Sequence, residues 1–205
     1  MILIVDYGMG NLHSVQKAFN RLRIEARITS DTNEISNADK LILPGVGNFK
    51  RGMENLTELG LIDALNKAVL ENRTSILGIC LGMQLFTKSS EEGDCKGLGW
   101  IDAKTVRFNF ENAEKKLKIP HIGWNTLDFM NESKLYEGIG EDPSFYFVHS
   151  FYVASNDDSA VMATTQYGTS FVSSAVKNNI FATQFHPEKS HDDGLKLLKN
   201  FAENC

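Results

Sequence analysis

The chain has 205 residues, a formal net charge of -5 and a hydrophobic content of 42%. It is therefore long enough to bury one substantial core, and its charge gives no sign of a nucleic-acid-binding surface. No apolar run approaches the ~20 residues that a membrane-spanning helix needs. We predict a single domain over residues 1–205 that acts without nucleic acid and without a membrane.

The cysteines and the first residues indicate where the protein works. The three cysteines, Cys80, Cys95 and Cys205, are widely spaced and form no C-x-x-C pair. This spacing argues against a disulfide framework and a zinc site, and it favours a reducing, cytoplasmic compartment. The apolar start at residues 1–5 lacks a basic segment and meets a charge at Asp6, so it predicts a strand and not a secretion signal. We expect no metal and no cofactor.

Strand and helix patterns alternate through the first half of the chain. The predicted strands cover residues 2–5, 26–29, 41–43 and 75–79. The predicted helices cover residues 11–23 and 59–70, and a further helix runs through Gln84 and Phe86. Such alternation is typical of a parallel sheet covered by helices on both faces.

The second half of the chain changes character. Four strand-like segments, at residues 144–153, 160–166, 171–177 and 180–185, are separated by short turns. A helix start of the S-x-x-D kind follows at Ser190. We therefore expect an α/β fold whose mixed, mostly parallel central sheet is flanked by helices and ends in an antiparallel C-terminal part.

A glycine-rich segment, Pro-Gly-Val-Gly at residues 44–47, follows the third predicted strand. Its backbone amides are free to point outward, so Val46 and Gly47 could supply a donor to an oxyanion; an ordinary strand-to-loop turn fits this segment equally well. Another glycine-rich segment, residues 7–11, resembles a dinucleotide-binding loop. That interpretation fails because His13 stands where the third glycine belongs.

The sequence Gly-Ile-Cys-Leu-Gly at residues 78–82 joins an apolar run to a helical pattern. It has the G-x-nucleophile-x-G spacing of a strand-to-helix elbow, with Cys80 as the nucleophile. Glycines on either side allow the tight turn, and the helix N-terminus favours a thiolate. The amide of Leu81 would then be an oxyanion donor. The alternative is a buried structural cysteine.

A base for this thiol is predicted at His186, within the sequence Gln-Phe-His-Pro-Glu at residues 184–188. Pro187 biases His186 toward an extended backbone, in which His186 and Glu188 project to the same side. Glu188 could then orient the imidazole, as in a nucleophile–base–orienter triad. Taken alone, residues 184–188 also fit a surface turn after a strand. Structural or surface roles are expected for the other four histidines, His13, His121, His149 and His191.

Six motifs in the same order resemble the class I (triad) glutamine amidotransferases, and among these the glutaminase subunits of imidazole glycerol phosphate synthase. They cover residues 6–12, 44–47, 78–84, 119–125, 146–150 and 184–190, and so span nearly the whole chain. The resemblance implies that Cys80 attacks the side-chain amide of glutamine, while His186 transfers protons and Glu188 orients His186.

The resemblance also implies roles for the residues around the nucleophile. Leu81, Val46 and Gly47 would form the oxyanion hole, and the segment of Val46 and Gly47 would rearrange when a partner binds. Gly47, Gln84 and the backbone of Ser150 and Phe151 would hold glutamine.

A separate (β/α)₈ cyclase subunit is the partner that the resemblance implies. Ammonia would pass to this subunit within a heterodimer and be used to form imidazole glycerol phosphate and aminoimidazole carboxamide ribotide, in histidine biosynthesis. The residues expected near the interface are Pro120, His121, Gly123, Trp124 and Asn125.

Three other functions are compatible with the same residues. The chain could feed ammonia to a different acceptor, such as a sugar amidotransferase partner. It could be a stand-alone γ-glutamyl hydrolase, which would be fully active without a partner. It could also be a non-catalytic module on the same fold, although an intact triad argues against this.

Overall fold

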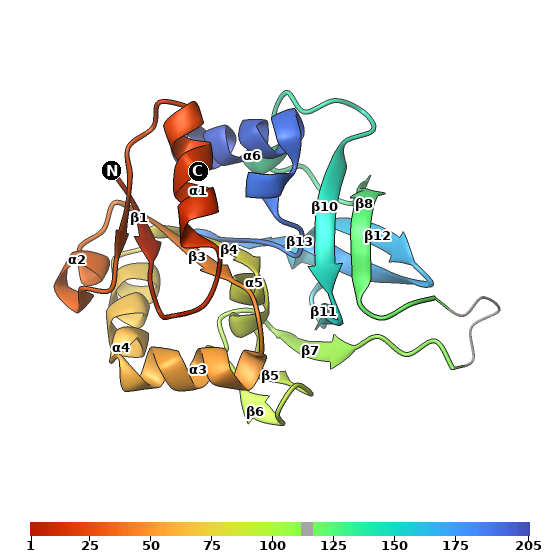
Figure 1. Cartoon of the computed structure of the whole chain (residues 1–205), viewed down its shortest axis with the longest axis horizontal. Coiled ribbons are helices and arrows are strands. Elements are labelled where there is room, and N and C mark those ends of the chain that lie inside the picture. Colours follow the sequence, from red (N-terminus) through yellow and green to blue (C-terminus); the bar gives the residue numbers. More distant parts are fainter. Residues whose placement is uncertain (112–116) are drawn as a thin grey trace.

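A mixed 12-stranded sheet forms the body of the protein, with a separate two-stranded sheet beside it (Figure 1). The computed structural model describes residues 1–111 and 117–205. The sheet order is β2-β1-β3-β4-β14-β13-β11-β7-β5-β6, and β12 and β9 join through β13. Its parallel strands are β1 (Ile2–Val5), β2 (Ala26–Thr29), β3 (Lys40–Gly45), β4 (Ser75–Cys80) and β14 (Ile180–Thr183).

The remaining strands of the large sheet are β5 (Ser89–Ser90), β6 (Cys95–Lys96), β7 (Ala103–Arg107), β9 (Asp128–Phe129), β11 (Phe151–Ser155), β12 (Val161–Tyr167) and β13 (Thr169–Lys177). β5 pairs parallel with β7, whereas the pairs formed by β11, β12 and β13 with one another and with β14 confirm the expected antiparallel C-terminal part. β13 pairs antiparallel with β11, β12 and β14. The small sheet pairs β8 (His121–Thr126) with β10 (Ser144–His149).

Helices cover both faces of the parallel strands (Figure 1). They are α1 (Leu12–Arg21), α2 (Thr32–Ser36), α3 (Phe49–Glu58), α4 (Leu61–Asn66), α5 (Leu81–Leu85) and α6 (His191–Asn204), and a π-helical turn (Lys67–Glu71) extends α4. Short 3₁₀ turns occur at Lys134–Tyr136, Asp158–Ala160 and Pro187–Lys189. No helix in the described residues is long and apolar enough to cross a membrane.

Alternate residues of β1 face the two helical layers. Ile2 and Ile4 pack with apolar residues of α1 and α6, whereas Leu3 and Val5 pack with residues of α3 and α4. Both faces are therefore buried, which explains why β1 appears in the sequence as a continuous apolar run.

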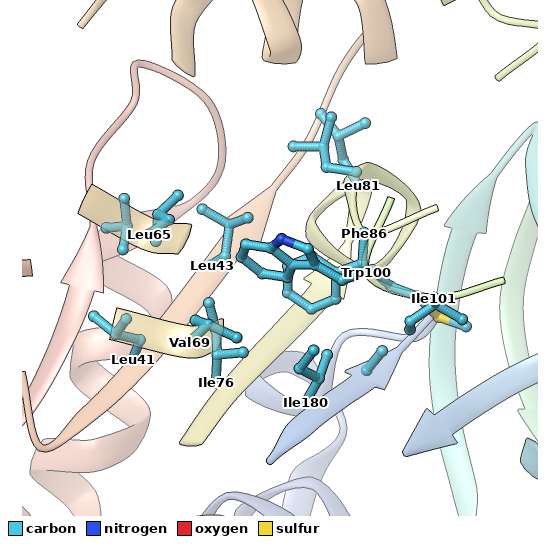
Figure 2. Packing of buried hydrophobic residues seen from close by; sticks show 14 of the residues in the cluster. Leu41, Leu43, Leu65, Val69, Ile76, Leu81, Phe86, Trp100, Ile101 and Ile180 are labelled. Carbon is cyan, nitrogen blue, oxygen red and sulfur yellow. The ribbon is translucent and has the colours of Figure 1, made fainter. Parts of the chain in front are cut away.

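An apolar cluster lies beneath the start of α5. Leu81 points into this cluster, where Phe86 and Trp100 pack together with ring centroids 4.9 Å apart (Figure 2). Leu43 of β3 lines the same cluster. Both ends of α5 are thus anchored in the core, so the residue that precedes the helix has little freedom to move.

The predicted elbow is present at the junction of β4 and α5. Cys80 is the last residue of β4 and has a φ of +55°, a conformation that non-glycine residues rarely adopt. Gly82 packs directly against β3, because a Cβ on Gly82 would collide with the carbonyl oxygen of Leu43. The missing side chain at residue 82 therefore lets α5 approach the sheet closely and hold Cys80 at the C-terminal end of β4.

One local prediction for the second half of the chain was wrong. Residues 144–153 do not form one strand: β10 ends at His149, β11 begins at Phe151, and Ser150 bends the chain between two sheets. The predicted helix start at Ser190 is confirmed, since α6 follows it directly, but the Ser190 side chain makes no capping hydrogen bond. Its hydroxyl instead donates to the His186 carbonyl and accepts from the Tyr146 amide, so it fastens β10 to the segment after β14.

Replacing Gly82 with alanine should destabilise the protein by about 3 kcal/mol, because the new methyl group meets the backbone of β3, which cannot move aside. Chemical denaturation of the variant measures this loss. Gly140 has open space around its Cβ position, so Gly140→Ala is the matched control and should change stability by less than about 0.5 kcal/mol. Equal stability of the two variants would contradict the tight packing of the elbow.

Candidate active site

Cys80, His186 and Glu188 meet at the C-terminal ends of the neighbouring central strands β4 and β14. β14 pairs parallel with β4, which places Thr183 beside Ile79 and brings residues 184–188 alongside Cys80. Nδ1 of His186 lies 2.8 Å from Oε1 of Glu188, and both side chains are only 2% exposed. Cys80 is 6% exposed. The Glu188 carboxylate therefore accepts a hydrogen bond from Nδ1–H, which fixes the ring and leaves Nε2 to exchange protons.

The electrostatics of this group favour a charged imidazole. Burial alone would lower the pKa of His186, but negative charge on the Cys80 sulfur and the neighbouring Glu188 carboxylate together raise that pKa well above its ordinary value. Within the described residues, Nε2 of His186 makes no well-formed hydrogen bond. An imidazolium at this position stabilises a thiolate at Cys80.

The candidate oxyanion donors belong to two chain segments that meet at Cys80. Leu81 begins α5 immediately after Cys80. Gly45, the last residue of β3, pairs with Cys80 in the parallel register, and Val46 and Gly47 follow Gly45 directly in the chain. Gly47 has a φ of +120°, and Val46 is 45% exposed. Leu81, Val46 and Gly47, which the sequence suggested for this role, thus all lie within two residues of the paired Gly45 and Cys80.

Two buried glutamines lie behind the sulfur. Nε2 of Gln84 donates to the Phe151 carbonyl at 2.9 Å and to Oε1 of Gln184 at 3.0 Å. Nε2 of Gln184 in turn lies 3.7 Å from Sγ of Cys80. Gln184 had no role in the sequence prediction, although a glutamine within an apolar strand pattern is a signal, since a buried amide requires partners.

Comparisons with known proteins agree with this geometry. The model of the family described as "Glutamine amidotransferase class-I" matches residues 3–205. The chain belongs to the class-I glutamine amidotransferase family. As a member of this family, it is an enzyme that acts on glutamine.

Relatives similar to this amidotransferase match it over their full length. Imidazole glycerol phosphate synthase subunit HisH 2 of Methanococcus maripaludis is 54% identical, with 100% of each chain covered. Subunit HisH 1 of Campylobacter jejuni is 52% identical over 98% of this chain and 99% of its own.

Solved structures share the fold at low sequence identity. A crystal structure of a glutamine amidotransferase has a TM-score of 0.75 and 21% identity, covering 98% of this chain and 100% of the other. The structure of PurLQS from Thermotoga maritima also gives a TM-score of 0.75, at 17% identity over 98% and 96% of the two chains. These likenesses concern the fold alone.

The residues expected at a partner interface do not all face solvent. Pro120 is exposed and Trp124 is 47% exposed, whereas Gly123 and Asn125 are half-buried. His121 is only 3% exposed and lies in the interior. The alternation of β8 explains this difference, because residues 122 and 124 point outward while residues 121 and 125 point inward.

An exposed aromatic face lies next to the triad. We define it as Ile122, Trp124, Tyr146, Lys189 and His191. The ring of Trp124 stacks on His191 with centroids 4.8 Å apart, and Nζ of Lys189 lies 5.8 Å from the centre of the Tyr146 ring. Lys189 follows Glu188 directly, so this surface borders the segment that carries His186, the predicted base.

A broad hollow elsewhere in the molecule is not the candidate active site. Its volume is about 990 Å³, and its lining runs along residues 129–141. No triad residue lines it. We therefore place the chemistry at the narrow region around Cys80, where the buried ionisable groups converge.

Replacing Glu188 with glutamine should slow alkylation of Cys80 by iodoacetamide at pH 6–7 about tenfold, since removing the carboxylate lowers the pKa of His186 and weakens the charge that stabilises the thiolate. Mass spectrometry of the Cys80 peptide separates this reaction from Cys95 and Cys205. Glu203→Gln, in an exposed pair on α6, is the control and should react at the wild-type rate. Unchanged alkylation of Glu188→Gln would remove Glu188 from the triad.

Proposed function

We propose that the chain is the glutaminase subunit of an imidazole glycerol phosphate synthase. In this proposal it hydrolyses glutamine and passes ammonia to a separate (β/α)₈ cyclase subunit. The full-length 54% identity to a subunit of that name supports the pathway. The observation that carries the chemistry is the buried His186–Glu188 pair beside Cys80, because only a proton-transferring imidazole makes that thiol a useful nucleophile.

The proposed reaction begins when the Cys80 thiolate attacks the side-chain carbonyl carbon of glutamine. A tetrahedral oxyanion forms, and its collapse breaks the C–N bond while His186 donates a proton to the leaving nitrogen. Ammonia departs and a γ-glutamyl thioester remains on Cys80. His186 then takes a proton from water, which attacks the thioester and releases glutamate. Glu188 keeps the imidazole oriented throughout.

The surrounding residues would bind the oxyanion and the substrate. The amide of Leu81 and an amide from the segment of Val46 and Gly47 are the proposed oxyanion donors, each worth about 3 kcal/mol of transition-state stabilisation. Gly47, Gln84 and the backbone at Ser150 and Phe151 are the proposed glutamine contacts. The hydrogen bonds that already hold Gln84 support this, since a fixed side chain binds with less loss of entropy.

The aromatic face is the proposed docking surface for the cyclase. Trp124 and Ile122 are large, apolar and exposed, and they border the segment that carries His186. Docking at this position would cover the mouth of the site. Transfer away from water has a physical reason, because ammonia that takes up a proton has no lone pair with which to attack an acceptor.

Replacing Cys80 with alanine should abolish ammonia release from glutamine, because no other group near His186 can form the thioester. The variant should still bind the cyclase, which size-exclusion chromatography of the mixture measures. Ammonia release that persists in Cys80→Ala would overturn the proposed chemistry. Comparing the wild-type chain alone with its cyclase complex tests the partner: a stand-alone hydrolase would be equally active in both.

Replacing Trp124 with alanine should weaken binding to the cyclase at least about tenfold, because exposed tryptophans near the centre of an interface contribute most of its affinity. Calorimetric titration of the two subunits gives this ratio. Phe129→Ala removes an aromatic ring of similar exposure outside the aromatic face and should leave the dissociation constant unchanged. Equal effects of both variants would place the interface elsewhere.

A further inference from the structure

Two buried histidines that take no part in the proposed reaction form a hydrogen-bonded pair next to the site. His121 lies on β8 and His149 lies opposite it on β10. Nδ1 of His121 is 3.0 Å from Nε2 of His149, and Nδ1 of His149 is 2.8 Å from the backbone oxygen of Phe151. The side chains are buried, so this contact is shielded from water.

The backbone at Phe151 fixes where the protons of this pair lie. A carbonyl oxygen can only accept, so Nδ1 of His149 carries a hydrogen. A neutral imidazole then leaves Nε2 of His149 as an acceptor, and Nδ1 of His121 must donate to it. Both rings are therefore assigned the Nδ1–H tautomer.

Asn125, which contacts His121 at the other end of the pair, independently indicates the same donor and acceptor roles for the two rings. The amide of Thr126 donates to Oδ1 of Asn125, and Nδ2 of Asn125 donates to the Gln166 carbonyl. The side-chain amide is thereby oriented with its nitrogen 3.4 Å from Nε2 of His121. That nitrogen can only donate, so Nε2 of His121 accepts. If either ring took up a second proton, its Nε2 would become a donor and would face another donor: Nδ1 of His121 or Nδ2 of Asn125.

The surroundings keep both rings uncharged. Aromatic rings enclose the pair, and Tyr167 of β12 stacks on His121 at a centroid distance of 4.0 Å. Burial lowers the pKa of His121 to about 4 and that of His149 to about 3. The hydrogen bond to the Phe151 carbonyl opposes the effect of burial on the pKa of His149, whereas His121 and His186 lower that pKa further. Among the described residues, no carboxylate acts on either ring.

The pair shapes the bend between the two sheets. His149 ends β10, Ser150 turns, and Phe151 begins β11. The Phe151 carbonyl accepts from both His149 and Gln84, so both of its lone pairs are used. The Val148 carbonyl, at the other side of the bend, lies 3.9 Å from Sγ of Cys80.

We propose that His121 and His149 are positioning residues that hold the bend at Ser150 and Phe151 in the shape that binds glutamine. This inference rests on the proposed function, which assigns glutamine to that backbone and to Gln84. The pair acts through the Phe151 carbonyl and touches no reacting atom. Its loss therefore affects the affinity for glutamine and not the chemical step.

The tautomers give a test that needs no activity. In the chain labelled with ¹⁵N-histidine, long-range ¹H–¹⁵N correlation spectra should show two histidines with the Nδ1–H pattern, unchanged from pH 8 to pH 5.5. The spectra of His121→Asn and His149→Asn assign the two signals. Either histidine in the Nε2–H form, or titrating near pH 6.5, would overturn the proposal, whatever the chain turns out to catalyse.

Two substitutions at residue 149 test the positioning role in the complex with the cyclase. Asparagine places its amide nitrogen close to the position of Nδ1 and keeps a donor for the Phe151 carbonyl, whereas leucine removes it. We expect His149→Leu to raise KM for glutamine about tenfold with kcat within about threefold, and His149→Asn to stay within about threefold of the wild-type KM. Thermal melts show whether each variant is folded.

The outcomes separate this inference from the proposed function. A folded His149→Leu with wild-type KM, or one with reduced kcat and unchanged KM, would overturn the positioning role. If His149→Leu does not fold, the spectra and the kinetics of His149→Asn still test the proposal. A His149→Asn variant with a reduced kcat and an unchanged KM would overturn the positioning role. A wild-type complex that releases no ammonia would reject the proposed function, and the spectra would still test the pair.

Discussion

The parallel pairing of β14 with β4 is the constraint on which the site depends. It joins residues that are far apart in the chain, since 104 positions separate Cys80 from Gln184. Its register decides which side chain follows beside the sulfur: Gln184 lies behind Cys80, and His186 lies two residues further along. A shift of one residue would turn His186 to the other side of the strand. The buried apolar residues on both faces of these strands hold the register in place.

The site combines a strained backbone with buried charge, and both require the surrounding packing. Cys80 has a positive φ, which costs on the order of 1–3 kcal/mol for a non-glycine residue. The close contact of Gly82 with β3 and the apolar cluster around Leu81 prevent the elbow from relaxing. A buried imidazolium is stable there because Glu188 and the sulfur supply negative charge on either side of the ring. The packing around the elbow thus holds the Cys80 sulfur in the position where its negative charge stabilises the imidazolium of His186.

The sequence predicted the elements whose signals are local. Continuous apolar runs located β1 and β4, and the predicted pairing of His186 with Glu188 is confirmed. His186 itself is extended as expected, but a 3₁₀ turn over Pro187–Lys189, and not a continued extended backbone, brings these two side chains together. What it could not predict depends on contacts between distant segments. Aromatic residues continue across Ser150, so nothing local marks the change of sheet. Ser190 has the sequence of a helix cap, yet β10 competes for its hydroxyl. Whether His121 faces inward follows only from the pairing of β8.

The two sides of β8 connect surface and interior within one short strand. Trp124 and His121 are three residues apart and therefore lie on opposite sides of the strand. The outward side carries the aromatic face, while the inward side reaches the Phe151 carbonyl through His149. β8 pairs only with β10 in its sheet, within the part of the chain that the structure describes, so the larger sheet does not fix it by backbone hydrogen bonds. Under the proposed docking at Trp124, the partner stabilises the same strand that holds the histidine pair. If glutamine binds at the bend as proposed, linkage then requires that it favours the docked state to the same extent.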